Sequence, residues 1–456
     1  MAAKVLRIWL GRCAPVAAAF VLALTGAAAE GVSGALLPPA APVEAAAPAK
    51  PAPGQPARKQ PQRESPAAAR RGPPPIARAF PAPAGESRFR RDEILVAFVA
   101  GAGGPAIDAV LRRHRLDPIE SATIALLGIT LRRLGIADAR EVAVVLREIG
   151  AEPLVAFAQP DYVYALEDDA GAASPRDDGP PQYALAKLRV DRAPAIGADE
   201  KVLVAVIDTA IDESHPDLAG AIAARFDAIG GAASARAHGT AIVGAIAARG
   251  GIGGVAPRCG ILAARAFESA GAGPQGTTYA ILEAIDWAAR AHARIINMSF
   301  AGPPDPALHR ILAAVFDKGV MLIAAAGNGG RKSPPLFPGA DEKVLAVTAT
   351  DADDRLFENA NVGRYVAVAA PGVDVLLPAP EGAYELATGT SVSAALVSGV
   401  AALVLERRPA MQPAALRNVL TTTATRLGGG GHEAEFGAGL VDAQGALAAA
   451  AGAASR

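Results

Sequence analysis

Four polar residues, far apart along the chain, carry the groups needed for nucleophilic attack on a carbonyl: Asp208, His238, Asn328 and Ser391. A serine hydroxyl is a poor nucleophile at neutral pH and needs a neutral imidazole that takes its proton during the attack. The imidazole needs a carboxylate that fixes its tautomer and stabilises its cation. The oxyanion that develops needs donors, for which the Asn328 amide and the backbone N–H of Ser391 are candidates. The set therefore predicts acyl transfer through a serine nucleophile.

Each of these residues stands where a regular element is expected to begin or end. Asp208 follows the apolar run 202–207, and Asn328 follows a second apolar run. His238 begins an apolar helical pattern, and Ser391 lies in a glycine-bearing turn that leads into another. Active sites of parallel sheets lie beyond the carboxyl ends of the strands. We therefore expect the four side chains to meet at one edge of a sheet.

Apolar runs and helical patterns alternate through the second half of the chain. Continuous apolar runs are typical of parallel strands buried on both faces, and their alternation with helices indicates an α/β domain. We predict an α/β fold in which a mostly parallel sheet carries helices on both faces. The further strand runs are 260–264, 295–298, 320–326, 344–348 and 366–369, and the helical segments are 279–291 and 306–318.

A smaller pattern, at residues 92–168, precedes this domain. Its order is strand, helix, two strands, helix, strand, which is the order of the ferredoxin-like α+β unit. Asp138 is the expected N-cap of the second helix. The strand patterns lie at 93–99, 123–134 and 155–166, and the first helical pattern lies at 106–115.

Three basic residues and an uncharged run begin the chain. Lys4, Arg7 and Arg12 precede residues 13–29, which end in three alanines. A basic start, a short apolar stretch and small residues at its end are the pattern of an export signal. We predict a signal peptide at residues 1–29 and a secreted or periplasmic protein. An uncleaved N-terminal membrane anchor is the alternative.

A basic, proline-rich segment follows, with 14 prolines in residues 38–83. Such a composition cannot form a packed core, so residues 30–91 are predicted to be a disordered linker. The excess of Lys and Arg would allow weak contact with a membrane or cell wall, and a plain solvated spacer is the alternative. A second linker, acidic and rich in small residues, is predicted at 169–182.

The composition limits the classes of function. Lys and Arg total 44 against 45 Asp and Glu, a net charge of -1, which argues against a protein that binds nucleic acid through bulk charge. Hydrophobic residues make up 51% of the chain, which excludes wholesale disorder. Cys13 lies in the predicted signal, so Cys259 would be the single thiol of the mature chain. A disulfide framework and a cysteine-ligated zinc site are therefore not expected.

Four motifs resemble those of the subtilisin-like serine peptidases, the subtilases. They are Val-Ile-Asp208-Thr with the following His-Pro-Asp-Leu, His238-Gly-Thr, Ala-Gly-Asn328 and Gly-Thr-Ser391. Their order is the family's order, unlike that of chymotrypsin or the α/β-hydrolases. The resemblance implies a catalytic domain at 183–451 with polypeptide substrates. It also implies an Asp208–His238–Ser391 triad, an acyl-enzyme and an oxyanion hole at Asn328.

The resemblance further implies how substrate and precursor are arranged. Residues 92–168 are similar to the family's propeptide, which implies that the prodomain inhibits its own enzyme and is cut away in the acidic linker. No cofactor is implied for the chemistry, and a structural calcium ion is left open. In the family a substrate pairs main chain to main chain between two segments. The matching residues here are Ser299, Phe300, Ala301 and Gly302 on one side and Ala270 and Gly271 on the other.

Several residues depart from the family's pattern. Ala210 stands where glycine is usual, Val243 where alanine is common, and Ser393 and Ala395 where alanine and proline are usual. None of these changes removes a reacting atom, so they bear on the rate of the reaction. They also motivate an alternative hypothesis, a weakly active or inactive relative that binds peptides.

Other polar residues have plainer interpretations. His215 follows Asp208 closely and is interpreted as structural rather than as a rival base. Asp212 is interpreted as a turn former. Asp351 and the two aspartates that follow it lack a full calcium loop and indicate a solvated turn. Cys259 is interpreted as a small core residue.

Overall fold

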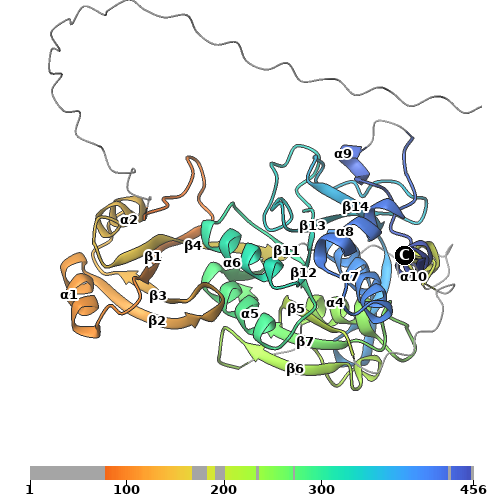
Figure 1. Ribbon diagram of the computed structural model, residues 1–456, viewed down its shortest axis with the longest axis horizontal. Coiled ribbons are helices and arrows are strands. Elements are labelled where there is room, and N and C mark those ends of the chain that lie inside the picture. The colour runs from red at the N-terminus through yellow and green to blue at the C-terminus, as the bar shows by residue number, and fades with distance from the viewer. Residues whose placement is uncertain are drawn as a thin grey trace, which may run out of the picture. The chain divides into compact units, whose positions relative to one another are not determined.

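The computed structural model describes residues 78–166, 182–190, 201–232, 236–270, 273–429 and 433–452 (Figure 1). All of them belong to one compact unit. The predicted signal peptide, most of the proline-rich linker and all but the last residue of the acidic linker lie outside the described residues. The predictions made for those segments stay predictions.

A seven-stranded parallel sheet lies at the centre of the larger domain (Figure 1). Its strand order is β14-β13-β12-β10-β5-β7-β6, and all neighbouring strands run parallel. This sheet confirms the predicted fold class. The strands are β5 (Leu203–Asp208), β6 (Ile222–Asp227), β7 (Gly260–Arg265), β10 (Ile295–Met298), β12 (Met321–Ala325), β13 (Leu345–Thr350) and β14 (Val366–Pro371).

Alternate residues of the central strands enter two separate cores, because successive side chains of a strand point to opposite faces. Val204 and Val206 of β5 belong to the core that includes α4 and α7. Ala205 and Ile207 belong to the core that includes α5 and α6. Helices therefore cover both faces of the sheet. The helices of the larger domain are α3 (Tyr183–Lys187), α4 (Ala237–Ala247), α5 (Thr278–Arg290), α6 (Pro306–Asp317), α7 (Thr390–Arg407), α8 (Pro413–Thr422), α9 (Glu433–Phe436) and α10 (Ala443–Gly452).

Helix α7 passes through the middle of the larger domain. Among the described residues it is the helix long and apolar enough to cross a membrane. However, 89% of its apolar window is buried inside the protein. That degree of burial is the pattern of a core helix.

The N-terminal unit, Phe89–Leu166, forms an antiparallel sheet with the strand order β2-β3-β1-β4. One face of this sheet packs against its own two helices, and the other face shares a core with α5 and α6. The elements are β1 (Phe89–Phe98), α1 (Gly104–His114), β2 (Leu116–Ile124), β3 (Ile129–Ile136), α2 (Val142–Ile149) and β4 (Val155–Leu166). Their order is the expected βαββαβ.

Short strands of the larger domain extend this second sheet. Strand β4 pairs with β9 on one side and with β11 on the other, at the end of its length. A separate hairpin, β15 with β16, lies apart from both sheets. The short strands are β8 (Glu268–Ala270), β9 (Gly273–Thr277), β11 (Phe300–Ala301), β15 (Val375–Ala379) and β16 (Ala383–Ala387), and the 3₁₀ turns are Ala125–Leu127, Pro216–Leu218 and Pro380–Gly382.

The structure differs from the sequence-based boundaries at the start of the N-terminal unit. We expected disorder as far as residue 91, but β1 begins at Phe89 and Ala79 forms a parallel bridge with Ala158 of β4. Aromatic contacts explain this order, because the Phe80 ring lies 5.3 Å from the Phe157 ring. The Arg310 guanidinium of α6 lies over both rings.

The second helix of the N-terminal unit also begins later than predicted. Its N-cap is Glu141, not Asp138. The Asp138 carboxylate instead accepts a hydrogen bond of 2.7 Å from Nε of Arg140. A side chain engaged in this local ion pair is not available to cap a helix.

Candidate active site

Asp208 and His238 form a buried, hydrogen-bonded pair. Asp208 ends strand β5 and His238 lies in the first turn of α4. Oδ1 of Asp208 lies 2.7 Å from Nδ1 of His238 and also accepts from the backbone N–H of Thr209 at 2.7 Å. Because an ionised carboxylate only accepts, Nδ1 carries the proton and Nε2 is the nitrogen that can act as a base.

The start of α4 approaches the end of β5 closely because a glycine follows His238. A Cβ on Gly239 would lie 2.9 Å from the Thr209 carbonyl oxygen and 3.2 Å from Oδ1 of Asp208. The Gly239 N–H donates to Oγ1 of Thr209 at 3.2 Å. The His-Gly-Thr motif thus places the imidazole against the carboxylate through backbone geometry.

Ser391 lies in the first turn of α7 and is buried. Its carbonyl oxygen accepts from Oγ of Ser299 at 3.1 Å. Oγ of Ser299 accepts from Nδ2 of Asn297 at 2.9 Å, and Oδ1 of Asn297 accepts from Oγ of Ser398 at 2.9 Å. This chain of bonds ties the start of α7 to strand β10. The sequence analysis did not assign Asn297 and Ser398; a polar side chain within a buried strand, and one within a buried helix, were their signals.

Asn328 follows strand β12 and contacts the residue before Ser391. Its Oδ1 accepts from the backbone N–H of Thr390 at 3.1 Å and from the Thr390 hydroxyl at 2.8 Å. Two donors on the carbonyl oxygen fix which way the amide group is turned, so Nδ2 faces away from Thr390. That orientation suits an amide that donates to an oxyanion.

The three strands that end beside these residues are neighbours in the sheet. β5, β10 and β12 are adjacent in its order, and their pairing is parallel, so their carboxyl ends share one edge. The structure therefore places Asp208 with His238, and Asn328 with the turn that holds Ser391, at the carboxyl ends of these strands.

Strand β4 lies between β11, which contains two of the predicted substrate-flanking residues, and β9. On one side Leu166 pairs with Phe300 and Ala165 with Ala301. On the other side Tyr164 pairs with Gly276 of β9. The main chain of the N-terminal unit thus takes the place that β-augmentation gives to a peptide.

The predicted wall residues are placed as follows. Phe300 and Ala301 form β11, Ser299 holds the Ser391 carbonyl, and Gly302 pairs with Phe337. Ala270 belongs to β8, one strand further from β4, and Gly271 lies outside the described residues. The strand beside β4 is β9, which the sequence analysis missed. Gly276 was the one sign of this strand in the sequence. A glycine is needed there because a Cβ would lie 2.9 Å from the Phe267 ring.

The remaining candidates have structural partners. Nδ1 of His215 accepts from the Asp217 N–H, and its Nε2 lies 3.0 Å from the Ala383 carbonyl oxygen. Asp212 accepts from Ser214 and from the Glu381 N–H. Cys259 is buried in the core. Within the described ranges, no group of three or more His, Cys, Asp and Glu side chains is arranged to hold a metal ion.

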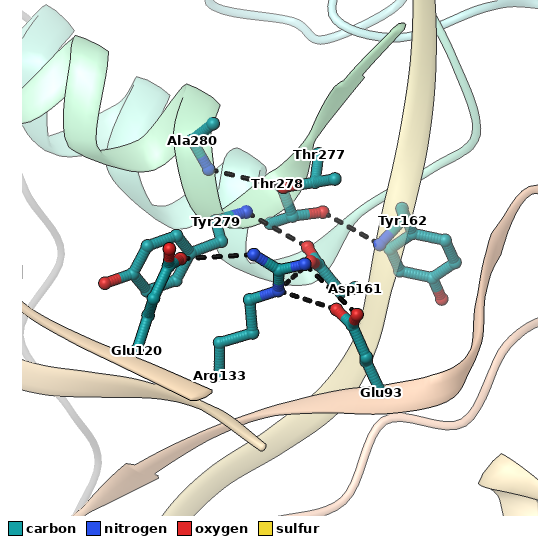
Figure 2. Close-up of polar contacts among 9 residues, drawn as sticks. All are labelled: Glu93, Glu120, Arg133, Asp161, Tyr162, Thr277, Thr278, Tyr279 and Ala280. Atoms are coloured by element: carbon teal, nitrogen blue, oxygen red, sulfur yellow. Dashed lines mark hydrogen bonds and ion pairs between the residues drawn. The ribbon is translucent and has the colours of Figure 1, made fainter. Parts of the chain in front are cut away.

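A second polar cluster lies where the N-terminal unit meets helix α5 (Figure 2). Arg133 donates to both carboxylate oxygens of Glu93, at 2.6 and 3.1 Å, and to Glu120 at 3.1 Å. Its Nε lies 3.7 Å from Oδ2 of Asp161. The other oxygen of Asp161 accepts from the backbone N–H of Tyr279 at 3.1 Å, in the first turn of α5.

Burial changes the acidity of two carboxyl groups at this contact. It raises the pKa of Asp161, which is fully buried, from 3.8 to about 7, although the Tyr279 N–H and Arg133 oppose the rise. It also raises the pKa of Glu283 of α5 from 4.5 to about 7, with Glu120 and Asp286 adding to the effect.

Comparison with known proteins shows the family to which the larger domain belongs. Residues 199–439, more than half of the chain, match the Subtilase family. Subtilisin DY from Bacillus licheniformis is 33% identical over 275 residues, which cover 58% of this chain and 97% of that protein. Subtilisin E from Bacillus subtilis (strain 168) is 31% identical over 314 residues, which cover 66% of this chain and 77% of that protein.

A solved structure shares the fold. The crystal structure of fervidolysin from Fervidobacterium pennivorans, a keratinolytic enzyme related to subtilisin, superimposes with a TM-score of 0.69 at 22% identity. The match covers 82% of this chain and 63% of the fervidolysin chain, so this chain spans less than two thirds of that protein's length. At this identity the likeness concerns the fold alone. With the family match and the subtilisin relatives, it follows that this chain belongs to the subtilase family of serine endopeptidases.

Proposed function

We propose that the chain is the precursor of an exported, self-processing serine endopeptidase. Asp208, His238 and Ser391 form its triad, and Asn328 supplies the oxyanion-hole amide. The observation that carries this proposal is the 2.7 Å bond between Oδ1 of Asp208 and Nδ1 of His238. This bond holds the imidazole proton on Nδ1 and leaves Nε2 to act as the base, which is the tautomer that the reaction requires. The subtilisin relatives support export, to the periplasm or the medium.

The reaction follows from the roles of these groups. Oγ of Ser391 attacks the peptide carbonyl carbon as Nε2 of His238 takes its proton, and Asp208 stabilises the imidazolium. The oxyanion accepts hydrogen bonds from Nδ2 of Asn328 and from the Ser391 backbone N–H. His238 then gives the proton to the leaving amine, and an acyl-enzyme forms. Water, activated by the same imidazole, releases the acyl group and restores the Ser391 hydroxyl.

Residues 92–168 are proposed to be a propeptide that inhibits this enzyme within the same chain. Support comes from β4, which pairs with β11 and β9 where a substrate would pair. Its last described residue, Leu166, lies opposite Phe300, next to Ser299, which bonds to the Ser391 carbonyl. The chain therefore leaves β4 toward the nucleophile. This direction supports a processing site in the acidic linker at 169–182 or at the residues just before it.

A serine-directed probe tests the proposed nucleophile. We expect a fluorophosphonate to label the processed protein on Ser391 and on no other serine, because only a hydroxyl next to a base and an oxyanion hole reacts quickly with it. Peptide mass spectrometry of the labelled protein locates the adduct. The His238→Ala variant serves as the control, since it keeps the hydroxyl and loses the base. An unlabelled, folded and processed protein would contradict the proposal.

The two carboxyl groups with raised pKa predict that the propeptide docks more tightly in acid. Docking at low pH buries neutral Asp161 and Glu283, whereas docking above about pH 7 buries charges or requires proton uptake. The stabilisation of the docked state that these neutral carboxyl groups allow is complete below pH 4, and it is lost as the pH rises through about 7. For Asp161 alone the shift from 3.8 to about 7 corresponds to a docking constant that falls on the order of 1000-fold.

Amide hydrogen exchange of β4 in the uncleavable Ser391→Ala chain measures this effect. After correction for intrinsic exchange rates, protection should fall between pH 5 and pH 8. The Asp161→Asn chain carries a neutral group of the same shape at every pH, so its protection should fall much less. Equal losses of protection in the two chains would contradict the assignment to Asp161.

A further inference from the structure

The side chain of Tyr164 fills a closed pocket beside strand β4. β4 lies between β9 and β11, where we propose that substrate binds, so this inference rests on the proposed function. Tyr164 pairs with Gly276 of β9, and its side chain has no exposed surface. A substrate strand bound in the same register would direct one side chain into this pocket.

Two walls shape the pocket for a flat ring. The ring of Phe300 meets the Tyr164 ring edge-on, with centroids 5.7 Å apart and planes at 82°. Gly302 forms the other wall, where a Cβ would lie 2.3 Å from Cδ1 of Tyr164. Any larger residue at 302 would displace the ring. An aromatic side chain therefore fits the space that these residues leave.

A buried carboxylate lies at the end of the pocket. The Tyr164 hydroxyl donates to Oδ2 of Asp305 at 3.2 Å; the Pro303 carbonyl, at 3.4 Å, is the more distant acceptor. Asp305 is the N-cap of α6, and its carboxylate is buried. An aromatic ring without a hydroxyl would leave this side of the carboxylate facing a carbon atom.

The donors around Asp305 divide between the two parts of the chain. The larger domain supplies the backbone N–H groups of Ala307 and Leu308, at 2.8 and 3.1 Å, and the Thr278 hydroxyl at 2.5 Å. The N-terminal unit supplies the Tyr164 hydroxyl and, at 2.8 Å, the Gln159 amide. When β4 leaves, the Asp305 carboxylate still caps α6 but loses two of its hydrogen-bond donors. Burial raises the pKa of Asp305, and the hydrogen bonds that it accepts from Thr278, Gln159 and the backbone oppose the rise. A buried acceptor that lacks its donor is costly, so the pocket favours a ligand that replaces the donor.

We propose that this pocket is a substrate subsite that selects tyrosine over phenylalanine, with Asp305 as its specificity-determining residue. The substrates are polypeptides that carry tyrosine at the position of Tyr164, two residues before that of Leu166. A site built to bind a hydroxyl rejects the analogue that lacks it, because the site's own polar group is then unpaired.

Two internally quenched peptides test this selection. Both copy residues 160–182 of the chain, and one carries phenylalanine in place of Tyr164. We expect the processed enzyme to cut the tyrosine peptide with a kcat/KM at least about 10-fold higher, as for a buried acceptor that keeps its hydrogen-bond donor. In Asp305→Ser the hydroxyl still caps α6 but does not reach the phenol, so the ratio should fall to near one. Asp341→Asn changes a buried aspartate that pairs with His309, one turn further along α6, rather than with Tyr164, so it should keep the wild-type ratio.

Casein hydrolysis separates failure of this inference from failure of the proposed function. Casein cleaved with a wild-type ratio near one, or with neither peptide cut, would overturn the subsite alone. A high ratio that persists in Asp305→Ser would overturn the role of Asp305. If Asp305→Ser does not fold, Asp305→Asn takes its place, because asparagine can still cap α6. The ratio of kcat/KM for the tyrosine and phenylalanine peptides should then fall toward one. An unchanged ratio would overturn the role of Asp305. An enzyme that cuts neither casein nor peptides overturns both proposals.

Discussion

Replacement of Ser391 by alanine is expected to lower kcat for peptide hydrolysis by about 10⁶-fold, a magnitude known from subtilisin itself. The variant keeps Asp208, His238 and Asn328 but has no oxygen that can form the acyl-enzyme. The same loss should stop self-processing, so the chain should remain uncut between Leu166 and Gln182. Mass spectrometry of the mature N-terminus, with wild type beside the variant, reports both the activity and the processing site.

A nearby serine provides the matched control for this experiment. Ser393 lies on the same turn of α7, and its hydroxyl donates to the carbonyl oxygens of Ala370 and Pro371 at 3.0 and 2.9 Å. Its alanine variant loses these bonds, which should cost about 1 kcal/mol of stability, and should still process itself. Cleavage of the Ser391→Ala chain in a protease-free preparation would show that another enzyme performs the processing.

Replacement of Asp208 by asparagine is expected to lower kcat by about 10⁴-fold. Oδ1 of Asp208 holds the Nδ1 proton of His238 at 2.7 Å. An asparagine amide group facing Nδ1 would donate instead, which places the imidazole proton on Nε2 and blocks that nitrogen as a base. It would also remove the charge that stabilises the imidazolium. Initial rates on casein at pH 8, with circular dichroism to verify folding, measure the effect.

Asp212→Asn is the matched control for Asp208→Asn. Asp212 lies in the same loop, is also buried, and accepts from Ser214 and from the Glu381 N–H. Its substitution changes the same atoms of a carboxylate that does not contact His238, so kcat should remain within a few-fold of wild type. A loss of less than about 10-fold in Asp208→Asn would mean that His238 is oriented by something else.

The sequence by itself determined the reacting groups and the elements that carry them. The apolar run before Asp208 became β5, and the apolar pattern after Ser391 became α7. Such local patterns depend on the burial that each residue type prefers, so they can be recognised without tertiary contacts. The prediction was less accurate where one residue type is compatible with two local structures. Asp138, for example, bonds to Arg140 rather than capping a helix.

Only the tertiary structure decided how the two parts of the chain contact each other. The pairing of β4 with β9 and β11 joins segments more than one hundred residues apart, and no spacing in the sequence encodes that register. The raised pKa of Asp161 and the bond from Tyr164 to Asp305 likewise exist because packing removes water from those carboxylates. Desolvation is a property of the assembled surroundings, so residue types alone do not predict it.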